Sequence, residues 1–435
     1  MDLRTRDRWR WVLWVTLAGG FLLVNFHRVS TAVLADSLNR AFDTSAAELG
    51  LLHASFFYIY APLQLPAGVL ADRVGTRRVA AVGVGVMSVG VVGFALAESL
   101  LLGFVGRALV GLGGSVCYIA ILRFCANWFR TDQFATMTGW TVAAAGLGGV
   151  LATTPLALAV TAAGWRESLL ATAAVGGALA VAIYVLVRDS PQKAGFAAVE
   201  GATAPHRSVD LSTVWRNVRH VLRDRETWVM GLMLFFLIGT NFTVLGLWGV
   251  PYVADVYGTS VTTASTYVLL GNVGFLLGPP VFGTLSDRLG RRTELILAAT
   301  VLFTVSYGAV FLSVTPPLAL FGVLLFLAMF SNGGGVLAYT VAKERHAASA
   351  SGTVTGTVNS LGYFGAAVFP AVMGVVLDTY WTGRTLDGAR VYTVTGYRVA
   401  FGLATATGLV AVACAAYLHV RTGSGVDERA VAADD

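Results

Sequence analysis

Two stretches of the chain repeat one another: GVLADRVGTRR at Gly68–Arg78 and GTLSDRLGRR at Gly283–Arg292. They start 215 residues apart, and six positions coincide in that register: Gly68/Gly283, Leu70/Leu285, Asp72/Asp287, Arg73/Arg288, Gly75/Gly290 and Arg77/Arg292. Pro155 and Pro370 obey the same offset. Each stretch is a group of charges between two long apolar runs, so the sequence indicates an internal duplication.

The composition is that of a membrane protein. Of the 435 residues, 56% are hydrophobic and only 12% are charged, whereas soluble domains carry about 25% charged residues. The mean hydropathy is +0.71, and the 50 glycines fit transmembrane helices, whose backbones approach closely at glycine. Cys117, Cys125 and Cys414 have no paired or metal-ligand spacing. The sequence therefore predicts neither a metal site nor a cofactor.

An apolar helix needs about 20 residues to cross a hydrocarbon core of roughly 30 Å. Twelve runs qualify, and we expect spans at 12–34, 47–70, 79–98, 100–125, 134–163, 167–188, 227–253, 262–285, 293–314, 317–341, 350–377 and 397–421. The first run could be read as a signal peptide, since Val33-Leu34-Ala35 resembles a cleavage site. Its length and the presence of Arg28 argue against that interpretation.

The basic residues predict the orientation, because they accumulate on the cytoplasmic side of short loops. Both repeated stretches and the N-terminal arginines would then be cytoplasmic, together with Arg188, Lys193, Arg207, Arg216, Arg219, Arg223 and Arg225. The opposite loops keep Arg40, Arg166, Arg384, Arg390 and Arg398. Both termini are expected in the cytoplasm. Topology accounts for the net charge of +6, so we expect no nucleic-acid partner.

The chain divides into two halves of six spans. We predict an N-terminal half at 1–188, a cytoplasmic linker at 189–226, a C-terminal half at 227–421 and a cytoplasmic tail at 422–435. The linker places Val214, Val218 and Val221 at helical spacing among arginines, which is typical of a basic helix lying on the membrane surface. A calmodulin-type target helix is the alternative interpretation of this segment.

The repeated stretch resembles the hallmark loop of the major facilitator superfamily, G-x-L-x-D-R-x-G-x-R-R. Gly68–Arg78 matches it in full, and in the second copy Thr293 replaces the last arginine. The resemblance covers essentially the whole chain. It implies an all-α membrane protein of twelve helices in two parallel six-helix halves. It also implies a secondary active transporter that works by alternating access, which we expect to be a monomer in the lipid bilayer.

The repeated stretches are predicted to form a conformational latch. Gly75 and Gly290 permit a left-handed turn at a helix end, and the carboxylates of Asp72 and Asp287 suit the positive N-terminus of a neighbouring helix. The resemblance implies that these neighbours begin near Ser349–Gly352 and Asp132–Thr136, in the opposite half. The full predicted latch is Gly68, Asp72, Arg73, Gly75, Arg77, Arg78, Gly283, Asp287, Arg288, Gly290, Arg291 and Arg292. The alternative is that the arginines only fix topology.

Charged residues within a span are costly in the bilayer and indicate function. Arg107 begins RALVGLGG, which is similar to the family's R-x-x-x-G-x-G signature, where the arginine is linked to energy coupling. It could equally hold backbone carbonyls. Arg28 lies in NFHRVSTAVLADSL, which resembles a first-span string of the anion:cation symporter branch. That resemblance implies that Arg28 binds a substrate carboxylate, although His27 stands where the branch has an aspartate.

The proton-coupling candidates are His27, His53 and Arg107. His27 is favoured, because an arriving anion beside Arg28 would favour its protonated ring. Polar and aromatic residues in the spans that line the family's cavity are substrate-binding candidates. With Arg28 these are Asn25, Tyr58, Tyr118, Asn241, Trp248, Asn332, Asn359 and Tyr363, and Tyr60, Gln64 and Asn272 occupy similar positions. Many of them are expected to serve as interhelical hydrogen bonds.

The function predicted from the sequence is uptake of a small organic anion with protons. The alternative is a proton-driven exporter of amphipathic compounds, although Gly146–Gly149 lacks the proline of the family's antiporter motif. An intramembrane enzyme would need a catalytic pair, an HExxH motif or a GxSxG motif, and the sequence has none. A receptor on the same scaffold stays open. The arginine-rich, lysine-poor composition suggests a prokaryotic inner membrane.

Overall fold

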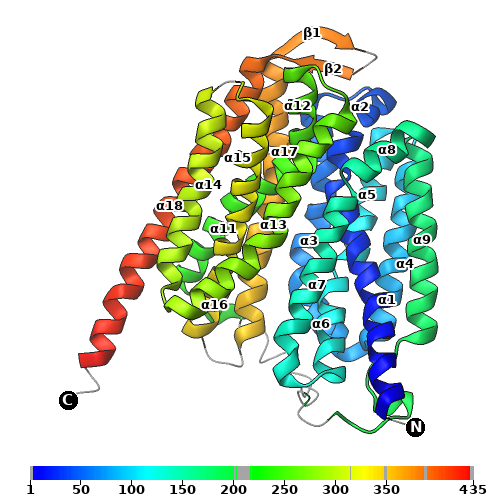
Figure 1. Ribbon diagram of the computed structural model, residues 1–435, viewed down its shortest axis with the longest axis vertical. Helices are drawn as coiled ribbons and strands as arrows, with labels where there is room; N and C mark the ends of the chain where they lie inside the picture. Colours follow the sequence, from blue (N-terminus) through cyan, green and yellow to red (C-terminus); the bar gives the residue numbers. More distant parts are fainter. Residues whose placement is uncertain are drawn as a thin grey trace.

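The chain folds into a bundle of long helices that run between two ends (Figure 1). The computed structural model describes residues 3–199, 202, 216, 218–313, 315–346, 350–386 and 389–431. We call the end with the β1–β2 hairpin (Trp381–Leu386 and Ala389–Tyr392) the hairpin end. The opposite end carries both termini and residues 189–199, and we call it the linker end.

The N-terminal helices lie together on one side of the bundle. They are α1 (Leu3–Val29), α2 (Thr31–Phe42), α3 (Ala46–Val74), α4 (Thr76–Ala95), α5 (Leu100–Gly114), α6 (Cys117–Trp128), α7 (Thr131–Leu151), α8 (Thr154–Ala163) and α9 (Trp165–Leu186). The short 3-10 turn η1 (Gln192–Ala194) follows at the linker end.

The C-terminal helices form the other side (Figure 1). They are α11 (Arg225–Thr243), the π-helical turn η2 (Val244–Trp248), α12 (Gly249–Tyr257), α13 (Val261–Leu289), α14 (Arg292–Ser313), α15 (Leu318–Phe330), α16 (Asn332–Arg345), α17 (Ser351–Thr379) and α18 (Val394–Val431). The helices of the two sides converge at the hairpin end and diverge toward the linker end.

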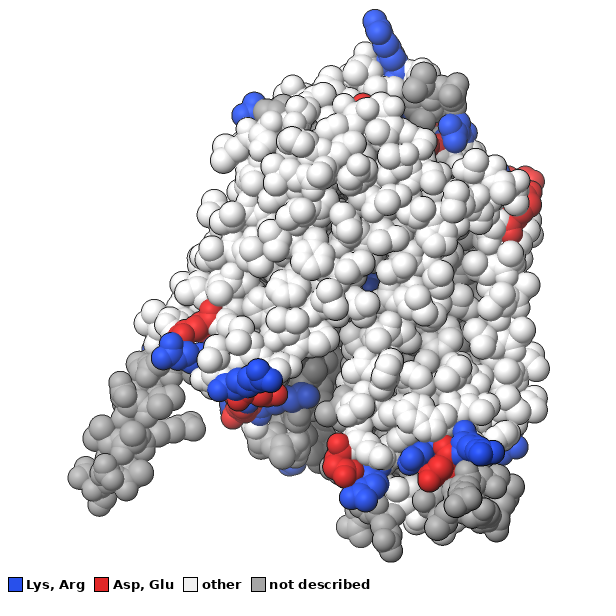
Figure 2. All heavy atoms as spheres, in the orientation of Figure 1, with Lys and Arg blue, Asp and Glu red and all other residues white. Residues whose placement is uncertain are grey.

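Eleven stretches of the described chain are long and apolar enough to cross a membrane. They correspond to eleven of the twelve predicted spans. The remaining span, predicted at 47–70, is the 29-residue helix α3, which is long enough to cross but carries Glu48, His53 and Gln64. The large exposed side chains include Leu101, Val89 and Leu409, and the charged groups lie almost entirely at the two ends (Figure 2). An apolar belt of this kind is what a bilayer requires.

Spans 1, 4, 7 and 10 are each interrupted near the middle, which the sequence did not predict. Three of the breaks fall at a serine whose hydroxyl donates a hydrogen bond to the carbonyl three residues earlier. The bonds are Ser30 Oγ to His27 O at 3.1 Å, Ser115 Oγ to Leu112 O at 2.7 Å and Ser331 Oγ to Ala328 O at 2.6 Å. Such bonds bend helices and satisfy a carbonyl that the break would leave unpaired.

The fourth break is the π-helical turn η2 in span 7, where all five residues are buried. Turns of this kind are frequent at functional sites, because they widen the helix and redirect its side chains. Span 5 is also divided, between α7 and α8, with Thr153 in a non-helical conformation. The predicted single helices over these spans are therefore each two shorter segments.

Both repeated stretches end a helix at a glycine with positive φ, as predicted. Gly290 has φ 68° and ψ 8°, which is the left-handed helical conformation. Gly75 differs, because its φ of 92° and ψ of 156° lie in a region open only to glycine. A tight contact also requires glycine here, since a Cβ on Gly75 would lie 2.8 Å from the oxygens of the Asp189 carboxylate. That carboxylate accepts a hydrogen bond from the Arg77 N–H at 2.9 Å.

Three other sequence predictions concern loops and termini, and the structure differs from the first two. The all-helical prediction missed the antiparallel hairpin, whose alternating WTGRTL and ARVY strands turn back between α17 and α18. The predicted tail at 422–435 begins inside α18, whose backbone stays helical to Val431. The predicted linker helix falls largely outside the described residues, although 218–221 is helical. Gly68 and Asp72 lie within α3, but the surroundings of Gly68 and the side chain of Asp72 are outside what is described.

Candidate substrate and coupling site

Arg28 lies at the last turn of α1, next to the first break, and is 7% exposed. Its Cζ lies 4.3 Å from the centre of the Phe242 ring and 5.8 Å from that of Phe275. These aromatic residues belong to α11 and α13, so the guanidinium reaches from the N-terminal half onto the C-terminal half. Within the part of the chain that the structure describes, Arg28 forms neither an ion pair nor a hydrogen bond.

Aromatic side chains from both halves surround this contact. Phe242 stacks against Tyr363 at 5.9 Å and against Phe57 at 6.3 Å. Tyr60 meets Tyr363 edge to face at 4.9 Å. The predicted residues Arg28, Tyr60 and Tyr363 are therefore brought together around Phe242. Sequence reasoning missed Phe57, Phe242 and Phe275, since nothing distinguishes them among 24 phenylalanines.

Arg107 organises the first break from α5. The residue is 1% exposed, and its Nη1 donates to the His27 carbonyl at 3.3 Å. That carbonyl also accepts the hydroxyl of Ser30. This is the carbonyl-holding role that the sequence left open for Arg107, and it joins two of the predicted coupling residues. The His27 ring, 3% exposed, lies edge to face on Phe26 at 5.2 Å.

His53, the third coupling candidate, lies on α3 at the contact between the halves. It is fully buried, and neither ring nitrogen has a hydrogen-bond partner among the described residues. Its ring faces Gly246 in the π-helical turn, where a Cβ would come within 2.8 Å of the His53 Cε1. The same turn lies close to the Arg28 carbonyl. The break in span 7 therefore lies against two site candidates, the ring of His53 in span 2 and the backbone of Arg28 in span 1.

The buried centre of the bundle has a surplus of hydrogen-bond donors. In the described chain, the buried nitrogen donors without a partner include Arg28 Nε, Arg107 Nε, Arg107 Nη2, Gln64 Nε2 and Asn272 Nδ2. A buried donor without an acceptor is costly. An arrangement of this kind suits a ligand or water that supplies acceptors, and an anion supplies the strongest ones.

Four predicted substrate residues have their amide or indole nitrogen bonded within their own half of the chain. Asn25 bonds the Phe21 carbonyl at 2.9 Å, and Asn332 bonds the Met329 carbonyl at 3.2 Å. Trp248 donates to the Pro370 carbonyl at 3.2 Å. Asn241 lies between the Ala328 carbonyl and the Tyr307 hydroxyl, at 3.1 and 2.8 Å. These contacts position the broken helices.

The remaining predicted residues lie at other places on the inner surface. Asn359 of α17 receives the Tyr339 hydroxyl at 2.7 Å and donates across the halves to Gln64 Oε1 at 3.3 Å. Tyr118, just after the break in span 4, stacks on Phe21 at 5.2 Å. Tyr58 is half-buried and packs against Phe104 at 6.2 Å.

The repeated stretches are tied to their own halves. Arg77 Nε donates to the Tyr184 carbonyl at 2.6 Å, and its guanidinium covers the Tyr184 ring. In the second copy, Arg292 pairs with Glu344 of α16 and Arg291 pairs with Glu294. Asp287 is exposed. The predicted contacts of Asp72 and Asp287 with the opposite half stay predictions.

The comparisons with known proteins agree with this architecture. The family model described as the Major Facilitator Superfamily matches residues 15–370. The membrane sensor protein UhpC of Escherichia coli is 26% identical over 88% of this chain and 89% of its own length. The hexuronate transporter of Bacillus subtilis is 23% identical over 88% and 91%. A probable sulfoacetate transporter of Cupriavidus necator is 26% identical over 63% and 64%.

Solved structures share the fold at low identity. A bacterial homologue of the human lysosomal transporter Spinster superposes with a TM-score of 0.75 at 17% identity, over 95% of this chain and 97% of the other. A D-xylose–proton symporter superposes with a TM-score of 0.69 at 17% identity, over 94% and 97%. The duplicated loop, the paired sets of broken helices and a family match over most of the length lead to one conclusion. The chain belongs to the Major Facilitator Superfamily and is an integral membrane secondary transporter, not an enzyme.

Proposed function

We propose that this transporter takes up a small organic anion together with protons. The observation that carries the proposal is Arg28, a buried guanidinium that rests on Phe242 and lacks an acceptor in the described chain. A guanidinium presents paired N–H donors that match a carboxylate, phosphate or sulfonate group. Its strength as an anion ligand rises in a site from which water is excluded. An incoming anion would bind Arg28 at the junction of the two halves.

The named relatives support this substrate class. Two of them carry the names hexuronate transporter and probable sulfoacetate transporter, and both named solutes are anions. The buried donors Gln64 Nε2 of α3 and Asn272 Nδ2 of α13, which lack partners in the described chain, also favour an acceptor-rich solute. Tyr363 and Tyr60 would enclose its carbon skeleton. The substrate set that we propose is therefore Arg28, Gln64, Asn272 and Tyr363, with Phe242 as the platform.

Proton coupling is assigned to His27, which precedes Arg28 in the chain. Its carbonyl is fixed by Arg107 and Ser30, so the turn that carries the imidazole has a defined position. An anion bound at Arg28, the next residue in the chain, would favour the positive form of this imidazole. Substrate and proton would then bind together and leave together, which is the requirement for symport.

The orientation and the moving parts complete the proposal. We take the linker end as cytoplasmic, on the basis of its basic residues, and residues 1–188 and 227–421 as the two moving bodies. The contacts at the hairpin end then describe a transporter closed toward the outside. The repeated stretches, including Asp72 and Asp287, would close the cytoplasmic side in the opposite orientation.

A second function is favoured by one observation. The ring cluster of Phe57, Tyr60, Phe242 and Tyr363 would also suit an amphipathic compound, as an exporter requires. Arg28 in the middle of that cluster favours an anion over the cationic compounds that such a surface often attracts. The two functions differ in the charge of the ligand and in the direction of transport.

The test is ligand binding followed by transport. Purified protein is melted in the presence of galacturonate, glucose 6-phosphate, sulfoacetate, neutral glucose and a cationic dye. A ligand at a hundred times its Kd stabilises the protein by about 2.7 kcal/mol, and we expect stabilisation by at least one anion. Proteoliposomes with an inward pH gradient should then accumulate that anion. Binding without uptake would instead indicate a receptor, and stabilisation by the dye alone would favour the exporter.

A further inference from the structure

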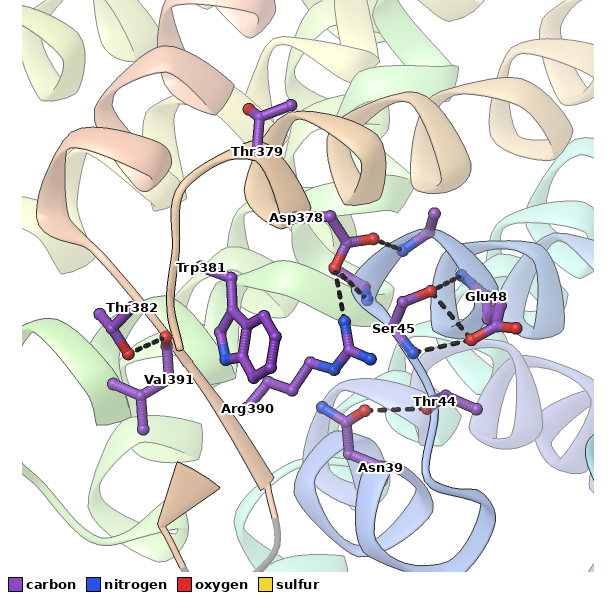
Figure 3. A network of polar contacts seen from close by, with 12 residues as sticks. Asn39, Thr44, Ser45, Glu48, Asp378, Thr379, Trp381, Thr382, Arg390 and Val391 are labelled. Carbon is purple, nitrogen blue, oxygen red and sulfur yellow. Dashed lines mark hydrogen bonds and ion pairs between the residues drawn. The ribbon is translucent and has the colours of Figure 1, made fainter. Parts of the chain in front are cut away.

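At the hairpin end, the last turn of α17 reaches across to the first turn of α3 (Figure 3). The two oxygens of the Asp378 carboxylate accept hydrogen bonds from the backbone N–H groups of Ala46, at 2.9 Å, and Ala47, at 2.8 Å. Asp378 belongs to the C-terminal half, whereas α3 belongs to the N-terminal half. A single side chain thus supplies two hydrogen bonds across the contact that closes this end.

The first N–H groups of a helix have no partner within the helix. In α3 the Glu48 N–H is satisfied locally, because Ser45 Oγ accepts it at 3.2 Å and Glu48 Oε2 in turn accepts the Ser45 N–H at 2.8 Å. The other two, at Ala46 and Ala47, depend on Asp378. The end of α3 therefore has one cap from its own half and one from the opposite half.

The two helices are antiparallel and pack closely below this cap. A Cβ on Gly50 would come within 2.7 Å of the Ala371 Cα, and one on Gly374 would come within 2.7 Å of the Ala47 N. Glycine at both positions lets the backbones touch. The carboxylate therefore meets the N–H groups only when the halves are closed at this end.

The hairpin holds the carboxylate from the other side. Arg390 Nη1 of β2 lies 3.5 Å from Asp378 Oδ1, and its guanidinium covers the Trp381 ring at 4.6 Å. Figure 3 shows Arg390 pointing between Trp381 and Asp378. This arrangement fixes the negative charge in front of the positive end of the α3 dipole.

We infer that Asp378 is the latch of the hairpin end and stabilises the orientation in which this end is closed. The inference rests on the proposed alternating access, and it concerns a residue outside the repeated stretches. If Asp72, at the other end of α3, caps the start of α17 as expected, each of these two helices caps the first turn of the other, one at each end of the bundle. Each orientation of the halves would then be held by one carboxylate that satisfies the partner helix.

The experiment uses purified full-length protein in detergent, with its three buried cysteines replaced by alanine. One reporter cysteine, Ala54→Cys, lies at a fully buried position of α3 and should become accessible when the hairpin end opens. A second, Thr136→Cys, is exposed near the start of α7 at the linker end and becomes protected when that end closes. Labelling by a water-soluble maleimide is followed in Asp378→Asn. Ser45→Ala is the matched control, because it removes the cap of the Glu48 N–H from within the same half and changes no charge.

Asp378→Asn should raise the labelling rate at position 54 about fivefold or more, as expected for a carboxylate at a helix N-terminus, and lower it at position 136. Ser45→Ala should leave both rates near those of the parent. Equal rates in Asp378→Asn and the parent, or equal shifts in both variants, would overturn the latch. A rise at both reporters would mean general loosening and would also overturn it. None of these outcomes depends on which solute is carried, so they are separate from the test of transport.

Discussion

The guanidinium of Arg28 lies 4.3 Å above the ring of Phe242, and the two residues come from opposite halves of the chain. A contact of this kind combines a charge that has no acceptor among the described residues with the junction between the two halves. Binding of the proposed anion at this point would change the electrostatic balance of the contact itself. Substrate recognition and the relative position of the halves would then be joined through one pair of side chains.

Arg28→Lys should weaken binding of the anionic substrate about 10- to 100-fold, because lysine keeps the charge but loses the paired donors. Arg28→Ala should nearly abolish binding. Phe242→Leu keeps the apolar volume and removes the ring, so a smaller loss of a few-fold is expected, of the order of one cation–π contact. Isothermal titration with the anion identified by thermal shift measures the Kd of each of the three variants. Parent-like affinity in Arg28→Ala would place the site elsewhere.

His27→Gln should separate exchange from accumulation. Glutamine keeps hydrogen bonding but cannot titrate, so exchange of labelled solute between two filled sides should survive, whereas uptake driven by a pH gradient should fail. His53→Gln serves as the comparison at the other buried histidine. Accumulation at the parent rate in His27→Gln would exclude that histidine as the coupling site.

Asp72→Asn and Asp287→Asn should leave expression and orientation unchanged, because the arginines that set topology remain. Each substitution removes a carboxylate that we expect to cap a helix only when the linker end is closed, at a cost of about 0.3–1 kcal/mol. Labelling of a cysteine at the linker end should therefore rise in both variants. Unchanged labelling together with normal transport would leave the repeated stretches with a topological role only.

Asp189 offers a pH-dependent test of the first repeated stretch. Burial alone raises the pKa of Asp189, but the hydrogen bond from the Arg77 N–H and the nearby Lys193 ammonium outweigh it and hold the pKa below 3.8. A lowered pKa in the folded protein means a stabilising contribution that is present above pH 3.8 and lost as the pH falls further.

We expect Asp189→Asn to destabilise the protein by about 1 kcal/mol at pH 7 and by progressively less below pH 3.8. Thermal melting across that range measures the difference. Asp132→Asn is the control, because its ion pair with Arg130 is 65% and 60% exposed and should contribute little. A difference that does not shrink on acidification would show that the Asp189 charge is not what stabilises the loop.

Much of the fold could be predicted because a bilayer permits few kinds of structure to cross it. The duplicated stretch and the apolar runs led to the family and to the spans, since each run must be about 20 residues long. The breaks could not be predicted from their serines. Ser55 donates to the Leu52 carbonyl in the same way at 2.7 Å, yet α3 continues through it. What differs is the packing around each serine, which the local sequence does not contain.

Only the charged and polar residues of the candidate site could be predicted from the sequence. Arg28 was identified because a buried guanidinium is rare in a membrane, whereas Phe242 resembles every other apolar residue. Asn241 and Phe242 are neighbours in the chain, but a helix turns by about 100° per residue. Asn241 therefore bonds within the C-terminal half while Phe242 faces Arg28. Asp378 was missed for a related reason. Charged residues are common at helix ends, and nothing in the sequence near Asp378 shows that it bonds the N–H groups of Ala46 and Ala47 in the other half.

Serine-anchored bends at mid-depth have a consequence for how such a carrier can evolve. The bend at Ser30 lies two residues from Arg28, the side chain that we assign to the anion, whereas the carboxylate caps lie at the ends of other helices. Substitutions around a bend can therefore change what is carried and leave the switch intact. On this proposal selectivity and motion are set at different depths of the bundle, which would let relatives named as a sensor, a hexuronate transporter and a probable sulfoacetate transporter share one architecture.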